Sequence, residues 1–240
     1  MVFDALSRLE AEYDVRVIAA RDTGSRAWGL ADPDSDYDVG FVFAQSAAAY
    51  GKLGEYRASI DTRERDVELH GWNVKRFGEL LADSNPSALE LVHSPVSYTA
   101  HPAFDALAED VAFAPLSLYH HYRSLAETNA ARIRTGTATV KTNLYRVRGY
   151  CYARYVLDTH AFPELDFPRF LEEEADRFDE AVLTEARTLV DRKRAGEGEV
   201  SVGDAFGELS LPSEVDPREH AVEPPDIERI NAFIESALAH

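Results

Sequence analysis

The first hundred residues alternate between segments of helical and of strand periodicity. Apolar positions recur at helical spacing over residues 3–12, and residues 15–20 (VRVIAA) form a short apolar run that predicts a strand. Residues 37–43 (YDVGFVF) are rich in β-branched and aromatic side chains, which favours a second strand. Residues 57–61 and 65–72 predict a hairpin joined by a polar turn.

Helical patterns dominate the rest of the chain. Residues 74–81 have helical periodicity, and Asn85-Pro86 opens a helix that reaches residue 92, because Pro is favoured at the first helical position. Further helices are predicted from Phe104 onward, over residues 115–134, 139–157, 167–192 (in two pieces) and 226–238. Residues 195–225 are rich in Gly and Pro and predict a loop.

These elements predict the α+β fold class, with a small mixed sheet of four or five strands and flanking helices, followed by an all-helical domain. The change from alternating to helical pattern falls near Pro102. We therefore expect one domain over residues 1–101 and a second over residues 102–240.

Composition indicates where in the cell the protein is expected to be found. No stretch approaches the roughly 20 apolar residues that a membrane span needs, so no membrane partner is expected. The acidic N-terminus lacks the basic-then-apolar order of a signal peptide. The single cysteine, Cys151, fits a buried thiol in a reducing cytoplasm.

The charge is strongly negative, at -18, and only four of the 25 basic residues are lysine. An acidic, lysine-poor surface predicts a salt-adapted (halophilic) protein, because the Debye length is only about 3 Å at about 1 M salt and self-repulsion is then screened. The same charge disfavours nucleic-acid binding through broad basic coverage.

Residues 115–158 depart from this acidity. They contain seven basic and two acidic residues, a local charge of +5, so the rest of the chain carries -23. Such an island needs a negative partner. That partner is either the acidic part of the same protein or an anionic ligand.

The most informative stretch is residues 24–43, GSRAWGLADPDSDYDVGFVF. Gly24 and Ser25 follow a predicted strand at a point where a helix is expected to begin. Free backbone N–H groups at a helix N-terminus bind phosphate, glycine allows close approach, and the Ser25 hydroxyl adds a donor. The pair therefore predicts a phosphate-binding turn.

Asp36 and Asp38 lie two residues apart at the start of the strand over residues 37–43, so their carboxylates point to one face. Hard oxygen ligands of this kind suit Mg²⁺ or Mn²⁺. A calcium loop does not fit, because Tyr37 and Phe43 occupy the positions that need Gly and Glu. The acidic residues just before, Asp32 and Asp34, fit a solvated turn. A phosphate cradle beside a dicarboxylate site predicts two-metal phosphoryl or nucleotidyl transfer.

Several short motifs accompany this pair. They are GSRAWG at residues 24–29, SDYD at 35–38, Gly71-Trp72 before Lys75, Asn85-Pro86, Leu89-Glu90, Ser94-Pro95 and KTNLYRVR at 141–148. Together they resemble the DNA polymerase β-type nucleotidyltransferase superfamily. Within it they are similar to the branch of RNA repair pathway, or RNA-ligase-associated, nucleotidyltransferases. The resemblance extends over residues 15–157.

This resemblance implies a sheet domain that carries Gly-Ser and three carboxylates, and a helical domain that closes over the nucleotide. It implies transfer of a nucleoside monophosphate from an NTP such as ATP to a hydroxyl, with Asp36 and Asp38 as ligands of Mg²⁺ or Mn²⁺ and with release of pyrophosphate. The third acidic residue, a catalytic metal ligand, corresponds to Glu68, although strand alternation also places Asp66 on that face. Asn73 departs from the pattern, where the branch has Asp.

The basic island then has a role beside the nucleotide. Lys141, Tyr145 and Arg148 lie at positions i, i+4 and i+7 of one helix face, where they can neutralise phosphates. Pairing with acidic surface, or core packing for Tyr145, is the alternative. Arg26 is a further candidate for phosphate binding, or it pairs with Asp32 or Asp34.

The sequence does not distinguish between an RNA end, a protein hydroxyl and a small molecule as acceptor of the nucleoside monophosphate. Only the resemblance favours RNA. A non-catalytic nucleotide-binding regulatory protein on the same fold is the alternative function. An antitoxin-like partner protein is a second alternative, which retention of both motifs disfavours. The oligomeric state cannot be read from the sequence.

Overall fold

The computed structural model describes residues 1–54, 56–109, 111–222 and 225–239. The chain forms two compact units. The sheet unit comprises Met1–Ala27, Asp36–Phe113 and Glu223–His240, and the helical unit comprises Trp28–Ser35 and Ala114–Val222. This division differs from the expected one at Pro102, because both a short inner segment and the C-terminal segment pack away from their neighbours in sequence.

The sheet has five strands in the order β3-β4-β2-β1-β5. They are β1 (Arg16–Asp22), β2 (Tyr37–Ala44), β3 (Ser59–Glu64), β4 (Val67–Asn73) and β5 (Ser97–Ala100). Strands β2 and β4 pair in parallel, and the other pairs are antiparallel, so the sheet is mixed. The predicted α+β fold class and mixed sheet are confirmed. The short edge strand β5 was absent from the prediction.

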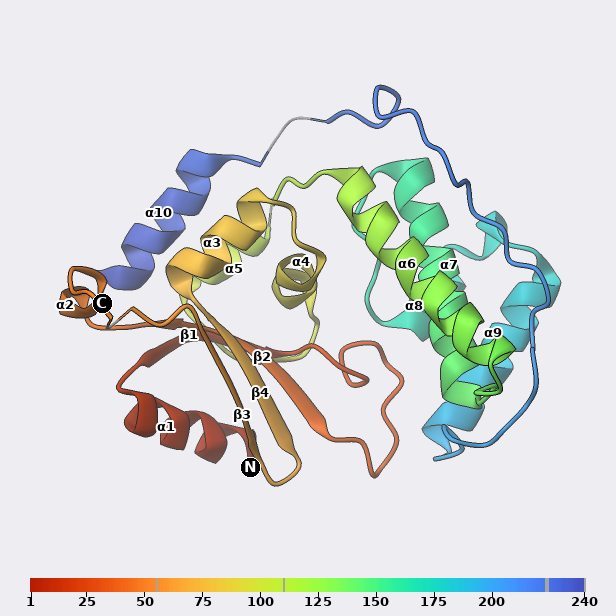
Figure 1. Cartoon of the computed structure of the whole chain (residues 1–240), viewed down its shortest axis with the longest axis horizontal. Helices are drawn as coiled ribbons and strands as arrows, with labels where there is room; N and C mark the ends of the chain where they lie inside the picture. The colour runs from red at the N-terminus through yellow and green to blue at the C-terminus, as the bar shows by residue number, and fades with distance from the viewer. Residues whose placement is uncertain (55, 110, 223–224, 240) are drawn as a thin grey trace. The chain divides into compact units, whose positions relative to one another are not determined.

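The two faces of the sheet are covered differently (Figure 1). Helix α1 (Val2–Tyr13) lies on one face, where its Leu6 and Leu9 join a buried cluster with Val39 and Leu69 of the strands. Because side chains alternate along a strand, the residues next to Val39 and Leu69 point to the opposite face. Helices α3 (Val74–Ala82) and α4 (Pro86–His93) lie on that side. Asp38 and Glu68 are therefore half-buried on the face opposite α1.

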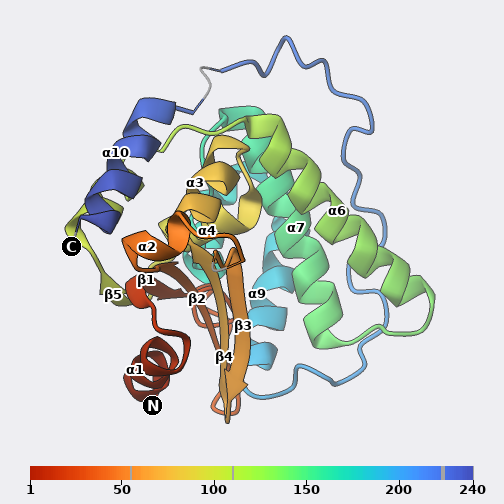
Figure 2. The same cartoon turned by 60° about the vertical axis from the view of Figure 1, so that its left-hand side comes forward.

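The C-terminal helix α10 (Ile227–Leu238) packs beside α3 and α5 (Pro102–Ala108), as both views show (Figures 1 and 2). Phe77, Phe104 and Phe233 form an aromatic cluster with ring centroids 5.8 to 6.1 Å apart. The apolar side of the amphipathic α10 is thus buried in the sheet unit. The one-turn helix α2 (Ala47–Tyr50) completes the elements described in this unit.

The helical unit is built on two long helices, α6 (Pro115–Arg134) and α7 (Val140–Thr159), which lie side by side (Figure 2). The shorter elements are α8 (Phe167–Glu173), η1 (Ala175–Arg177) and α9 (Glu180–Arg194). These match the predicted helices, and Cys151 is a buried free thiol as expected. Of the predicted loop over residues 195–225, positions 223 and 224 lie outside the described residues.

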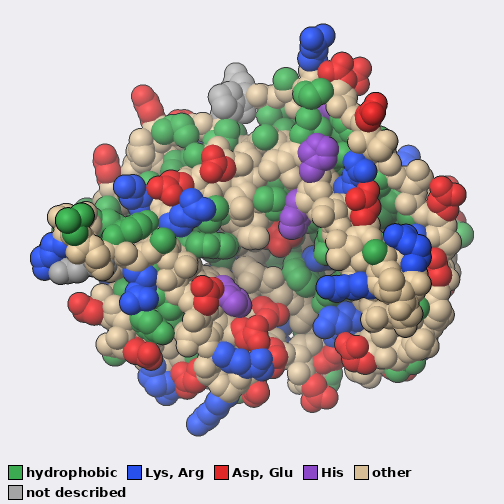
Figure 3. Space-filling model, in the orientation of Figure 1, with side chains coloured by type: hydrophobic (Ala, Val, Ile, Leu, Met, Phe, Trp, Pro, Cys, Tyr) green, Lys and Arg blue, Asp and Glu red, His purple; other side chains and the backbone are tan. Residues whose placement is uncertain are grey.

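No helix in the described ranges combines the length and the apolar composition needed to cross a membrane. Carboxylate side chains (red) are scattered over the face shown in Figure 3, among Lys and Arg side chains (blue).

Candidate active site

Gly24 and Ser25 follow β1 as predicted, but no helix begins there. Residues 24–29 form a turn instead. The carboxylate oxygen Oδ1 of Asp22 accepts the amide N–H groups of Gly24 (3.0 Å) and Ala27 (3.3 Å), and the turn ends at Gly29 with φ of 66°. The expected helix N-terminus is therefore wrong, because a buried side chain takes the amides that a first helical turn leaves free. Phosphate binding by this turn stays a prediction.

The turn lies directly against the second motif. A β-carbon built on Gly24 would be 1.9 Å from Oδ2 of Asp38, so no larger residue fits there without movement of Asp38. The amide N–H of Thr23 donates to the carbonyl oxygen of Asp38 at 2.7 Å. The folded sheet unit thus brings the Gly-Ser pair and the aspartate motif together.

Three acidic residues meet on this face of the sheet. Asp38 and Glu68 are direct partners in the parallel pairing of β2 with β4, and Asp36 precedes β2. Arg63 of β3 connects two of them, because its guanidinium donates to Oε1 of Glu68 (2.5 Å) and to Oδ2 of Asp36 (3.0 Å). The three carboxylates predicted as metal ligands are therefore neighbours.

The electrostatics of the group favour a cation. Burial is the main cause that raises the pKa of the Asp38 carboxyl above its usual range. Neighbouring negative charges raise it further, those of Asp22, Glu68 and Asp36. Within the described ranges, no three His, Cys, Asp or Glu side chains are already gathered in a metal-binding arrangement. The donor chemistry nevertheless fits Mg²⁺ or Mn²⁺, whose charge would relieve this repulsion.

Asp66, the alternative third carboxylate, lies in the turn between β3 and β4. Its side chain is exposed, and its carbonyl oxygen accepts the amide N–H of Tyr37 at 2.8 Å. Strand alternation begins only at Val67, so the structure places Glu68, and not Asp66, beside Asp38.

A cavity of about 310 Å³ lies on the same face, and Nε2 of its lining residue His70 is 3.9 Å from Oε2 of Glu68. It is lined by Thr23, Gly40, Asp61, His70, Gly71, Trp72, Ser87 and Glu90. Nδ1 of His70 lies 2.9 Å from Oδ1 of Asp61. The sequence analysis did not identify this cavity, because its lining comes from three strands, the segment after β1 and a helix, which only the fold brings together. Alternation along β4 puts His70 on the same face as Glu68, whereas no local pattern indicates Ser87.

Asn73, which stands where the resembled branch has Asp, has a structural role. Its buried side chain accepts the amide N–H of Lys75 and caps α3, and its Oδ1 also accepts the Tyr50 hydroxyl at 3.1 Å. Asn and Asp are both good N-caps, so the replacement keeps this role.

The predicted nucleotide-binding residues of α7 belong to the helical unit, whereas Gly24 and Ser25 belong to the sheet unit. Lys141 is exposed, and its Nζ lies 3.9 Å from Oε1 of Glu199. Arg148 is 3% exposed, and its guanidinium stacks 3.7 Å from the ring of Trp28. Tyr145 packs edge-on against the same ring, with centroids 5.7 Å apart.

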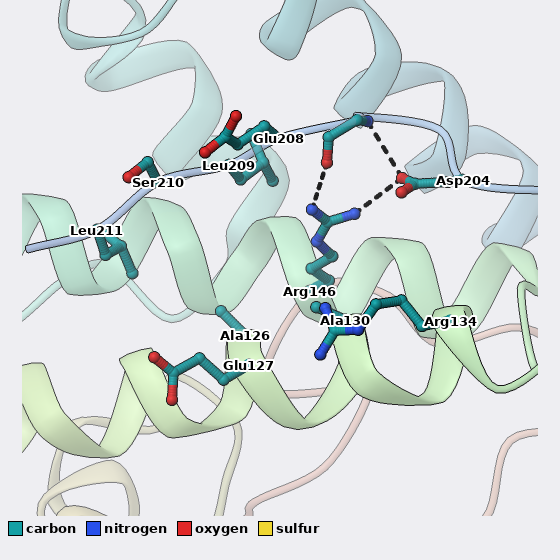
Figure 4. Close-up of a pocket in the computed structure, with 11 residues that line it drawn as sticks. Ala126, Glu127, Ala130, Arg134, Arg146, Asp204, Glu208, Leu209, Ser210 and Leu211 are labelled. Carbon is teal, nitrogen blue, oxygen red and sulfur yellow. Dashed lines mark hydrogen bonds and ion pairs between the residues drawn. The ribbon is translucent and has the colours of Figure 1, made fainter. Parts of the chain in front are cut away.

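Other cations of the basic island have partners inside the helical unit. Arg146 donates to Oδ1 of Asp204 (2.8 Å) and to the carbonyl oxygen of Gly207, at a cavity of about 480 Å³ beside α6 (Figure 4). Arg123 pairs with Glu127 on α6 at 2.8 Å. The island is therefore neutralised in part by carboxylates of its own unit.

Arg26 makes a cation–π contact within the sheet unit. Its guanidinium stacks over the ring of Tyr37 at 4.0 Å, within the sheet unit. Its charge also opposes the burial that raises the pKa of Asp22. Its contact with phosphate stays a prediction.

The sheet, the turn and the acidic group agree with a nucleotidyltransferase-like protein. A family model described as the RNA repair pathway DNA polymerase beta family matches residues 1–239, so the chain belongs to this family. The uncharacterized protein YcgL of Bacillus subtilis (strain 168) is 30% identical over 237 residues, 95% of this chain and 85% of that protein.

A solved structure is also similar. It is the crystal structure of a nucleotidyltransferase-like protein from Exiguobacterium sibiricum 255-15, matched over 100% of this chain and 75% of that one. The identity is 14% and the TM-score is 0.32, so the family assignment rests on the sequence match.

Proposed function

We propose that this protein is a metal-dependent nucleotidyltransferase. It transfers a nucleoside monophosphate from an NTP to a hydroxyl acceptor. The observation that carries the proposal is the contact between the Gly24 turn and Asp38, with Glu68 paired to Asp38 on the next strand. Membership in the family supports it. A phosphate cradle and a carboxylate group within one site are what phosphoryl chemistry needs.

In this proposal, Asp36, Asp38 and Glu68 hold Mg²⁺ or Mn²⁺, which supplies positive charge for the phosphates and the leaving group. The turn residues Gly24 and Ser25 hold the phosphate chain through backbone amides and the Ser25 hydroxyl.

The acceptor oxygen forms a bond to the α-phosphorus, while the bond from the α-phosphorus to the bridging oxygen breaks and pyrophosphate leaves. Glu68 accepts the proton of the acceptor hydroxyl. Arg26, Lys141, Tyr145 and Arg148 contact the remainder of the nucleotide.

We assign the acceptor to the cavity beside Glu68. Its lining holds two carboxylates, Asp61 and Glu90, and neither Lys nor Arg. Phosphate groups are disfavoured there by like charge. An RNA acceptor would therefore insert its terminal ribose, with its phosphates outside. Trp72 offers an aromatic surface for stacking of the base.

The decisive experiment measures pyrophosphate release. The protein is incubated with each NTP, with Mg²⁺ or Mn²⁺, and with a panel of RNA, protein and small-molecule acceptors. Asp36→Asn and Asp38→Asn should abolish release while the fold remains intact. Asp34→Asn is the matched control, because Asp34 is an exposed aspartate of the preceding turn. Wild-type protein that binds NTP and releases no pyrophosphate with any acceptor would instead favour the non-catalytic regulatory function.

A further inference from the structure

Ten residues separate Ser25 from Asp36, and the last eight of them pack in the other unit. Residues 28–35 belong to the helical unit, whereas Ser25 and Asp36 on either side belong to the sheet unit. We name residues 28–35 the bridging loop. The last residue of this loop, Ser35, is bonded directly to Asp36.

The backbone of the bridging loop is held by two helices. The amide N–H of Phe167, at the start of α8, donates to the carbonyl oxygen of Trp28 at 3.0 Å. Nε of Arg194, at the end of α9, donates to the carbonyl oxygen of Gly29 at 2.8 Å. The first two residues of the loop are thus fixed within the helical unit.

The Trp28 side chain is fixed as well. The Arg148 guanidinium stacks over its ring at 3.7 Å, and Tyr145 contacts it edge-on. Nε and Nη1 of Arg148 are buried and make no hydrogen bond within the described residues. Stacking on Trp28 is therefore a principal contact of this buried cation.

A buried ion pair holds the middle of the loop. Nζ of Lys193 in α9 pairs with Oδ2 of Asp32, and the two side chains are 7% and 14% exposed. The hydrogen bond from Lys193 is the main cause that lowers the pKa of Asp32. The other oxygen of Asp32 accepts the Ser35 hydroxyl at 3.0 Å, one residue before Asp36. The sequence analysis placed Asp32 in a solvated turn, and this contact shows that it is instead an internal partner.

We propose that Asp32 and Lys193 are positioning residues, which hold Asp36 in the orientation for metal binding by fixing the bridging loop to α9. This inference rests on the proposed function. An ion pair that served stability alone would have no reason to affect the metal ligands. A positioning pair must affect metal affinity even where the fold is intact.

The test measures Mn²⁺ binding to the full-length protein without NTP, by calorimetry. Lys193→Met and Asp32→Asn should each raise the dissociation constant for Mn²⁺ by about tenfold or more. The conservative Lys193→Arg should retain wild-type affinity. Arg192→Met is the matched control, because Arg192 lies on the same helix and pairs with Glu197 at 2.6 Å. It should leave Mn²⁺ binding unchanged.

Thermal melts establish that each variant is folded at the assay temperature, and Asp32→Asn serves if Lys193→Met does not fold. Wild-type Mn²⁺ affinity in a folded Asp32→Asn or Lys193→Met protein overturns the positioning role and leaves the proposed function standing. Equal loss in Arg192→Met also overturns it, since the effect is then general to α9. A wild-type protein that binds no Mn²⁺ overturns the proposed function together with this inference.

Discussion

Gly24 and Asp38 are in such close contact that a single methyl group would overlap the aspartate. The distance from an added β-carbon to Oδ2 of Asp38 would be 1.9 Å, and to its β-carbon 2.6 Å. Glycine is thus required at this position by the neighbouring carboxylate. The phosphate turn and the acidic group form one packed assembly within the sheet unit.

Gly24→Ala should therefore impair transfer by moving Asp38. We expect activity to fall by about 10²-fold or more, because small displacements of reacting groups have effects of this size. Overpacking should also lower the free energy of unfolding by about 1–3 kcal/mol. Gly51→Ala is the control, since its added carbon would meet only ordinary contact at 3.8 Å. Near wild-type pyrophosphate release by Gly24→Ala would contradict the shared site.

Glu68→Gln and Asp66→Asn separate the two candidates for the third carboxylate. Glu68 pairs with Asp38 in the sheet, whereas Asp66 is exposed in a turn. We expect turnover at saturating NTP to fall by about 10²-fold or more in Glu68→Gln, as for loss of a general base, and to persist in Asp66→Asn. Loss only in Asp66→Asn would move the role two residues upstream. Loss in neither would favour the non-catalytic function.

Lys141→Ala should weaken NTP binding by about 1–3 kcal/mol, the range for a lost charge-assisted hydrogen bond. Its melting temperature should stay unchanged, because the pair with Glu199 is exposed and surface pairs contribute little. Arg148→Ala should weaken NTP binding to a similar extent, and it should also destabilise the helical unit, because Arg148 is buried against Trp28. Glu199→Gln is the control for Lys141. Unchanged NTP affinity in Lys141→Ala and in Arg148→Ala, measured by titration, would assign the island to internal pairing.

His93 should make the protein less stable in mild acid. Burial, aided by the charge of Arg21, lowers its pKa to about 4 from the usual 6.5. The folded state keeps this imidazole neutral while the unfolded state binds a proton below pH 6.5. The contribution of neutral His93 to the free energy of unfolding is complete above pH 6.5. It is lost between pH 6.5 and 4, by about 1.4 kcal/mol for each pH unit. Urea unfolding of the wild type should show a steeper loss in this window than that of His93→Gln. The same pH dependence of stability in the wild type and in His93→Gln would contradict this role of His93.

The melting temperature should rise with added KCl. Screening relieves the repulsion within a chain of net charge -18, and the relief grows as the Debye length shrinks to about 3 Å at 1 M salt. A melting curve recorded from low to molar KCl checks this. A flat or falling melting temperature would argue against salt adaptation.

The sequence predicted most elements because their signals are local. Two long runs without internal Pro predicted α6 and α7, and alternation predicted the face of β4 on which Glu68 lies. The turn after β1 was mistaken for a helix start, because the capping side chain of Asp22 leaves no trace in the pattern of apolar residues.

Long-range packing was beyond local signals. An amphipathic helix such as α10 must bury its apolar side. The sequence pattern of the helix does not indicate which surface of the protein it packs against. The pairing of Asp32 with Lys193 joins positions 161 residues apart, so neither residue differs locally from a solvated charge. The cavity beside Glu68 was missed for the same reason.

The return of α10 to the sheet unit has a consequence for biosynthesis. The aromatic cluster of Phe77, Phe104 and Phe233 needs a residue that the ribosome adds after the whole helical unit. Domains fold as units during synthesis, usually from the N-terminus onward. In this protein the helical unit is completed first, because its last residue is Val222 and the sheet unit also needs α10, which follows in the sequence. Until α10 is synthesised, the nascent sheet unit therefore leaves exposed the apolar surface that α10 later covers. This exposed surface is a binding site for chaperones during translation.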